Sequence, residues 1–235
     1  MNRLLAALRL DWVLQLRYGF FYAAGFSLLV WLAILKALPQ QVLPIALPLV
    51  VFLDLSIVGF YFMAGMVLFE KGENTLSALV VTPLRFWEYL SSKLITLTLM
   101  AVGVSMLLIL ANPTGVPGNV GSGLLGVIAM SVISLLIGLI SVSPFRSLST
   151  YMIPSQAYVL LMYAPIPSYF GWVESPFFYL FPTQGALLLL KGLFSRCRGL
   201  AGGLCAALKP DLVAGLTVAA QRLFNQYVIA REGER

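Results

Sequence analysis

The sequence contains no histidine and only two cysteines, and charged residues make up just 10% of its 235 positions. Histidine is the usual general base near neutral pH and the commonest zinc ligand, so its absence argues against zinc chemistry and most hydrolysis. No acids are paired at metal-binding spacing within an apolar run, and no base stands beside a serine to activate it. We therefore expect a chain that binds no metal or cofactor of its own and catalyses no covalent reaction.

The shortage of charge accompanies an abundance of apolar residues, which form 60% of the chain. Soluble domains carry about 25% charged residues, so this composition indicates an integral membrane protein surrounded by lipid. A helix needs about 20 apolar residues to cross a bilayer, and the chain has room for roughly six such spans. The net charge of +6 does not indicate nucleic-acid binding, because no basic face is interleaved with aromatic residues.

The apolar runs predict an all-α membrane protein, in which residues 1–235 form one transmembrane domain. The N-terminal 17 residues carry apolar positions at spacings of three and four, so we expect a helix lying in the membrane interface. The alternative is a frayed start of the first span. Residues 165–205 are rich in proline and aromatics but too short in apolar runs to span, which favours re-entrant or interfacial helices. The expected spans are residues 18–38, 43–69, 94–111, 122–142, 148–164 and 212–228.

Basic residues gather on one side of the predicted membrane. They precede the first span, follow the second and fourth spans, and occur at the C-terminal end, whereas the short connectors on the other side have almost none beyond Lys36. The bases of the long region before the last span carry little weight, because long loops obey the positive-inside rule poorly. We expect both termini in the cytoplasm. The early charges Arg3 and Asp11 argue against a cleaved signal peptide.

The charged loop at residues 70–93 interrupts two apolar runs with acids, bases, a glycine and a proline. Asn74 can cap a short helix over residues 75–81, in which Leu76 and Leu79 share an apolar face. Such a helix, joined directly to two spans, can dock in a groove of a cytosolic partner and turn a push into movement of the spans. The alternative is a solvated connector that only maintains the orientation of the protein.

This loop contains the pattern E-x-G-x-x-T-L-x-x-L-x-x-x-P, followed by Y-L-x-x-K and a new span. The pattern resembles the membrane subunit of type-2 ATP-binding-cassette exporters. Size and overall plan are most similar to small bacterial permeases of the fluoroquinolone-export type, which reside in the inner or plasma membrane. The residues that carry the resemblance are Glu70, Gly72, Thr75, Leu76, Leu79, Pro83, Tyr89, Leu90 and Lys93.

The resemblance implies both an architecture and a role. It implies six spans, an interfacial N-terminal helix, a cytoplasmic coupling helix between spans two and three, and re-entrant helices before span six. It also implies that two permease copies, identical or different, assemble in the lipid with separate ATPase subunits. The residues that would couple to the ATPase are Glu70, Gly72, Thr75, Leu76, Leu79 and Pro83.

ATP and Mg²⁺ would then bind the partner ATPase, because this chain contains no phosphate-cradling G-x-x-x-x-G-K-[S/T] loop. The expected cargo is a hydrophobic drug or a lipid-like molecule that is driven out of the cell. The alternative function is a membrane scaffold or assembly component that transports nothing.

Three residues outside the loop are also candidates. Asp54 lies in the middle of a predicted span, where a charge is costly. It is either a polar contact in the translocation path or at a dimer seam, or an acid that only packs helices together. Cys197 and Cys205 are expected outside the cytoplasm, where a disulfide can form, although two free thiols are the preferred alternative.

Overall fold

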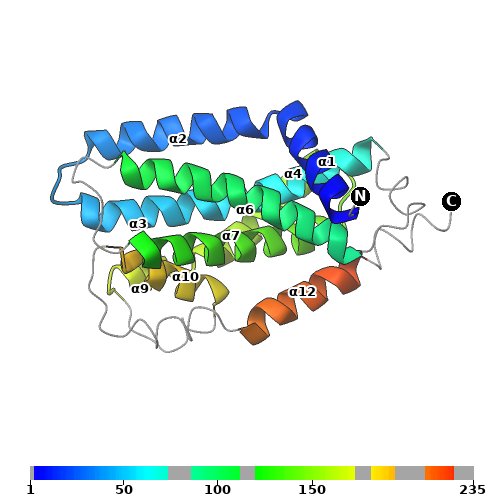
Figure 1. Cartoon of the computed structure of the whole chain (residues 1–235). Coiled ribbons are helices and arrows are strands. Elements are labelled where there is room, and N and C mark those ends of the chain that lie inside the picture. The colour runs from blue at the N-terminus through cyan, green and yellow to red at the C-terminus, as the bar shows by residue number, and fades with distance from the viewer. Residues whose placement is uncertain (1–2, 74–85, 112–119, 173–180, 194–209, 225–235) are drawn as a thin grey trace.

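The computed structural model describes residues 3–73, 86–111, 120–172, 181–193 and 210–224. Figure 1 shows long helices lying side by side, with short helices at the ends of the bundle. No strand occurs among the described residues, which confirms the all-α class predicted from the sequence. The elements are α1 (Arg3–Arg17), α2 (Phe20–Ala37), α3 (Leu43–Asp54), η1 (Leu55–Gly59), α4 (Phe60–Gly72), α6 (Phe86–Leu110), α7 (Val120–Val142), α8 (Leu148–Tyr163), α9 (Ile166–Tyr169), α10 (Pro182–Lys191) and α12 (Pro210–Phe224).

Four helical stretches of the described chain are long and apolar enough to cross a membrane. They are α2, the continuous stretch formed by α3, η1 and α4, then α6, and α7. They coincide with the first four predicted spans, and α6 begins at Phe86, before the predicted start at residue 94. Helices α8 and α12 lie where the fifth and sixth spans are predicted, but they have 16 and 15 residues. Because about 20 residues are needed, the six-span topology stays a prediction.

The second of these stretches changes its winding halfway along. Residues Leu55–Gly59 form a π-helix between α3 and α4, directly after Asp54. Pro44 lies in the first turn of α3, where a missing N–H costs nothing, whereas Pro48 lies inside that helix. Short π-helical segments inside α-helices frequently mark functional sites. This one lies beside the only acid in the middle of the stretch.

Helix α7 lies at the centre of the bundle and packs against α4, α6, α10 and α12. Two glycines bring it close to the second stretch. A Cβ atom on Gly138 would lie 2.6 Å from the carbonyl oxygen of Phe60, and one on Gly59 would lie 2.6 Å from Ser134 Oγ. Small residues of this kind allow helices to approach closely in a membrane, where van der Waals packing drives association.

Helix α1 lies across α6 at one end of the bundle, and its polar side is the side that packs inward (Figure 1). Asp11 and Gln15 are buried, whereas Leu5, Trp12 and Leu16 of the predicted apolar stripe are exposed. An exposed apolar stripe is what a helix needs to lie against lipid. The interfacial role of α1 remains a prediction, but its helical state and the direction of its two faces agree with it.

Two short helices, α9 and α10, occupy the described part of the predicted outer region at residues 165–205. Helix α10 is largely buried and packs on α7 and α3, and Thr183 Oγ1 donates a hydrogen bond to the carbonyl of Met162 over 3.1 Å. Their re-entrant or interfacial character stays a prediction. Cys197 and Cys205 lie outside the described residues, so the structure does not test whether they form a disulfide.

Candidate functional site

The described chain includes both ends of the predicted coupling loop. Glu70 and Gly72 lie in the last turn of α4, and Lys93 lies in the second turn after the start of α6. The middle of the loop lies outside the described residues, and with it Thr75, Leu76, Leu79 and Pro83. The described part of the site therefore consists of the two helix ends, of α4 and α6, that flank the loop.

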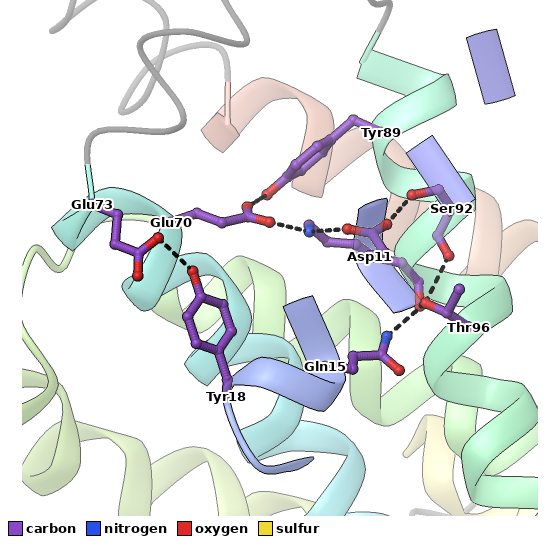
Figure 2. Close-up of polar contacts among 9 residues, drawn as sticks. Asp11, Gln15, Tyr18, Glu70, Glu73, Tyr89, Ser92 and Thr96 are labelled. Atoms are coloured by element: carbon purple, nitrogen blue, oxygen red, sulfur yellow. Dashed lines mark hydrogen bonds and ion pairs between the residues drawn. The ribbon is translucent and has the colours of Figure 1, made fainter. Parts of the chain in front are cut away.

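A buried ion pair joins the two ends of the loop. Lys93 Nζ donates to Glu70 Oε1, and Tyr89 Oη donates to Glu70 Oε2 over 2.7 Å (Figure 2). Lys93 is 0% exposed and Glu70 is 2% exposed, so water does not screen the pair. The ammonium group also lies 4.6 Å from the centre of the Tyr89 ring, within the range of a cation–π contact. The ends of α4 and α6 are thus held together at the exit of the loop.

The N-terminal helix supplies a second acid to the same lysine. Lys93 Nζ donates to Asp11 Oδ1 over 2.9 Å, and Ser92 Oγ donates to Asp11 Oδ2. One turn further along both helices, Gln15 Nε2 donates to Thr96 Oγ1 over 2.7 Å (Figure 2). We name the group formed by Asp11, Glu70, Tyr89, Ser92 and Lys93 the basal cluster.

In the basal cluster, the free energy of each buried charge depends on the neighbouring charges. One ammonium group lies between two carboxylates, and all three are at least 95% buried. Removing one member of a buried ion pair typically costs about 3–5 kcal/mol, because the partner is left charged without water or a counter-charge. The cluster therefore favours one relative placement of α1, α4 and α6.

Lys71 ties the same turn of α4 to the end of α7. Its Nζ donates to the carbonyls of Ser143 and Phe145, over 2.8 and 2.9 Å, and lies 3.4 Å from that of Val142. The last carbonyls of a helix have no partners within the helix and carry its negative dipole end, so a lysine there is favourable. Lys71 thereby caps α7 and holds the turn that leads into α8.

Glu73 ties the turn to a third place. Its carboxylate accepts a hydrogen bond of 2.9 Å from Tyr18 Oη in the α1–α2 connection, and Arg17 lies 3.8 Å from it. Burial, together with the neighbouring Glu73 carboxylate, raises the pKa of Tyr18 to about 12, so the hydroxyl remains a proton donor at neutral pH. Gly19, at a φ of 77°, then turns the chain from α1 into α2.

Together these contacts make the end of α4 a hub. Glu70 ties the end of α4 to Lys93 of α6, which in turn bonds Asp11 of α1. Lys71 ties it to the α7–α8 turn, and Glu73 ties it to the α1–α2 connection. A displacement of the loop at this point reaches every one of those elements. Such an arrangement can transmit force. Among the described residues, no three acids or cysteines lie close enough together to hold a metal ion.

Sequence reasoning found only part of this site. Glu70, Tyr89 and Lys93 belong to the loop pattern, but Asp11 is remote from it in sequence. A usable signal was present. Asp11 and Gln15 are four residues apart on one helix face, and Ser92 and Thr96 repeat that spacing on another, which is how two polar helix faces match.

Asp54 lies apart from the basal cluster, in the middle of the second stretch, and is 4% exposed. Its Oδ1 accepts hydrogen bonds from Ser27 Oγ and from Trp31 Nε1, the latter over 3.0 Å. Both donors come from one face of α2, four residues apart. The contact ties α2 to α3; the predicted places of Asp54 in a translocation path or at a dimer seam stay predictions.

Comparison with known proteins extends over nearly the whole chain. A model described as the fluoroquinolones export permease protein family matches residues 2–232. Two relatives, both named fluoroquinolones export permease protein, come from two strains of Mycobacterium tuberculosis. Each is 40% identical over 240 aligned residues, which cover 99% of this chain and 99% of the relative. No solved structure matches.

Proposed function

Because the chain belongs to the fluoroquinolone export permease family, we propose that it is the membrane subunit of an ATP-driven exporter that draws its energy from a separate ATPase. The relatives are named for fluoroquinolone export, and we propose the same cargo class, hydrophobic drugs that contain aromatic rings, for this chain. The chain itself is a multi-pass membrane protein of a permease family. The proposal concerns its energy source, its partner and its cargo.

One observation carries the energy-coupling part of the proposal, namely the buried Glu70–Lys93 pair at the base of the loop. A solvated connector whose only task is to maintain orientation has no need of a desolvated ion pair at its exit. Burying an ion pair is costly, and the best-attested benefit is that it fixes a specific arrangement. Helix ends that are held together can pass a displacement of the loop on to the spans. If these ends moved independently, the loop could be displaced without moving the spans.

The proposed path of force follows the contacts of the hub. A partner ATPase binds the apolar face of the predicted helix at residues 75–81 and pushes it during ATP-dependent closure. The push enters α4 through Gly72 and α6 through Lys93. Asp11 passes it to α1 and Lys71 passes it to the end of α7, so the spans move together.

The ATP-binding site belongs to the partner in this proposal. The sequence contains no phosphate-binding loop of the G-x-x-x-x-G-K-[S/T] type, so ATP and Mg²⁺ would bind only the ATPase. A second permease copy, identical or related, would complete the path. The cytoplasmic position of the loop and of both termini is part of the proposal and rests on the distribution of Lys and Arg.

The test is co-purification and ATP hydrolysis with the ATPase encoded beside the gene. Wild type is compared with Leu76→Asp/Leu79→Asp, which places two charges on the predicted docking face. The matched control is Ser77→Asp/Ala78→Asp, which places the same charges on the other face of the predicted helix. We expect the first variant to lose both assembly and coupled ATPase activity, and the control to retain both.

Two results would contradict the proposal. Either no ATPase associates with the wild-type protein, or the docking-face variant assembles and hydrolyses ATP as wild type does. In the first case the scaffold or assembly role becomes the better account, because a permease without an ATPase has no source of energy in this scheme. In the second case the predicted helix at residues 75–81 is not the docking face, and the proposed coupling fails.

A further inference from the structure

Asp54 is a buried acid whose described partners are all neutral. Ser27 and Trp31 are its hydrogen-bond donors, and none of the ion pairs among the described residues involves it. The stretch runs from Leu43 to Gly72, so at 1.5 Å per residue Asp54 lies about 17 Å from its start, near the middle of a membrane. An ionisable side chain at that depth typically faces a bundle interior or a substrate path.

Half of the carboxylate remains available to a ligand. Both hydrogen bonds within the described chain end on Oδ1, which leaves Oδ2 for another donor. Asp54 also lines a cavity of about 20 Å³ that lies between α2, the π-helix and α6. The other walls are apolar and include Ala24, Gly59, Phe62 and Met100. The cavity combines one acid with an otherwise apolar lining.

Helix α2 forms the least buried wall of the cavity. The present volume of the cavity holds about one water molecule, which is far too little for a drug, so drug binding requires the cavity to enlarge. Helix α2 is the least buried of the four candidate spans: 17% of its residues are buried, against 67% of an 18-residue apolar window of the second stretch. Among the described residues, the side-chain hydrogen bonds of α2 all go to Asp54 Oδ1. We therefore expect α2 to shift when a ligand binds Oδ2, with both hydrogen bonds to Oδ1 kept.

We propose that Asp54 binds the ammonium group of a hydrophobic, aromatic cargo molecule in this cavity. A cation neutralises the buried carboxylate, which Ser27 and Trp31 only solvate, and so offsets the cost of that charge in the membrane. Phe62 supplies an aromatic face, and Leu97 and Met100 supply apolar area, for the rest of the ligand. The choice of ligand rests on the proposed export function, whereas the acid and its cavity do not.

The experiment is equilibrium dialysis of the purified full chain, held in lipid nanodiscs without any ATPase. Two probes are compared, a fluoroquinolone with a free piperazine amine and the same compound acetylated on that nitrogen. The acetyl group removes the positive charge and adds few atoms. We expect wild type to bind the free amine about tenfold more tightly, as a hydrogen bond to a charged group supplies.

Asp54→Asn is the decisive variant, because the amide keeps an acceptor for Ser27 and Trp31 but carries no charge. We expect it to bind the two probes equally. Ser27→Ala keeps the carboxylate and removes a competing donor, so it should keep the preference for the free amine. This second variant tests the proposal even if Asp54→Asn fails to fold.

The inference is overturned if wild type binds the two probes equally or binds neither, or if Asp54→Asn retains the preference. In those cases Asp54 only packs helices. The outcome is separate from the ATPase test. A preference without any associated ATPase would keep this site and reject the proposed energy source, and the reverse result would reject the site alone.

Discussion

Among the described residues, acids are buried in two places, and only one of these places includes a base. In the basal cluster, Asp11 and Glu70 share the ammonium group of Lys93 at the end of the bundle. In the middle of the second stretch, Asp54 has two neutral donors from α2, the least buried of the candidate spans. The basal cluster contains one base for two acids and joins three helices. Asp54 has no base among its described partners and borders a cavity.

This difference indicates two different roles, force transmission for the basal cluster and ligand binding for Asp54. A cluster in which two carboxylates share one ammonium group favours a single arrangement and suits a part that must transmit force without yielding. An acid that lacks a counter-charge suits a part that exchanges partners, because any arriving cation improves its surroundings.

The largest effect is expected from Lys93→Met. It removes the ammonium group that Asp11 and Glu70 share, which should lower the free energy of unfolding by about 3–5 kcal/mol. Thermal unfolding in detergent measures the change. The matched control is Lys36→Met, the same substitution at an exposed lysine in the last turn of α2, and it should change little. Equal effects of the two substitutions would show that the basal cluster is not special.

A smaller effect is expected from Asp11→Asn and from Glu70→Gln, because each leaves Lys93 with one carboxylate. Each single variant should lower the free energy of unfolding by about 1–3 kcal/mol. The double variant should lose more than the sum of the two, since it removes the last acid from a buried ammonium group. If the two changes in the free energy of unfolding were strictly additive, the two acids would act independently and would not form one cluster.

For Asp54→Asn, we expect the free energy of unfolding to change by less than about 1 kcal/mol. The amide oxygen can keep the hydrogen bonds from Ser27 and Trp31, and the variant removes an uncompensated charge from the membrane. Thermal unfolding under the conditions used for Lys93→Met gives the comparison directly. If both substitutions destabilised the protein equally, the two acid sites would be alike and the contrast would fail.

The smallest effect is expected from Tyr18→Phe, at the exposed edge of the hub. The contact with Glu73 is partly open to water, so its loss should lower the free energy of unfolding by less than about 1 kcal/mol. The Tyr18 pKa of about 12 lies above its ordinary value, so the contact is complete below about pH 10 and is lost only as the pH rises toward 12. Unfolding of both proteins near pH 7 and pH 9 should therefore give the same difference.

Much of the bundle follows from hydropathy. Long apolar runs placed the first four spans, because a run of about 20 apolar residues has few alternatives to a membrane helix. The π-helix at Leu55–Gly59 could not be predicted, since apolar periodicity does not distinguish windings that differ by one residue per turn. The fifth and sixth spans remain open because α8 and α12 are shorter than the bilayer requires.

The site was predictable only where it lies in the loop pattern. Glu70 and Lys93 stand out because they flank the charged loop between two apolar runs, but their spacing does not predict that they form an ion pair. Asp11 was not predicted as part of the site, because the apolar stripe of the N-terminal helix was placed against lipid and its polar face was given no partner. In the structure Leu5 and Leu16 are exposed and Asp11 is buried against α6. A membrane removes the usual driving force for burying the apolar face, so polar matching decides the packing.

The most direct test of the account measures drug transported per ATP hydrolysed in liposomes that contain the complex with its ATPase. Glu70→Gln breaks the ion pair at the loop base while leaving the predicted docking face at residues 75–81 intact. The account predicts that the complex still assembles and that less drug is moved per ATP, because the push is no longer passed from the loop to α6 and α1. An unchanged ratio in an assembled complex would contradict the claim that the basal cluster transmits force.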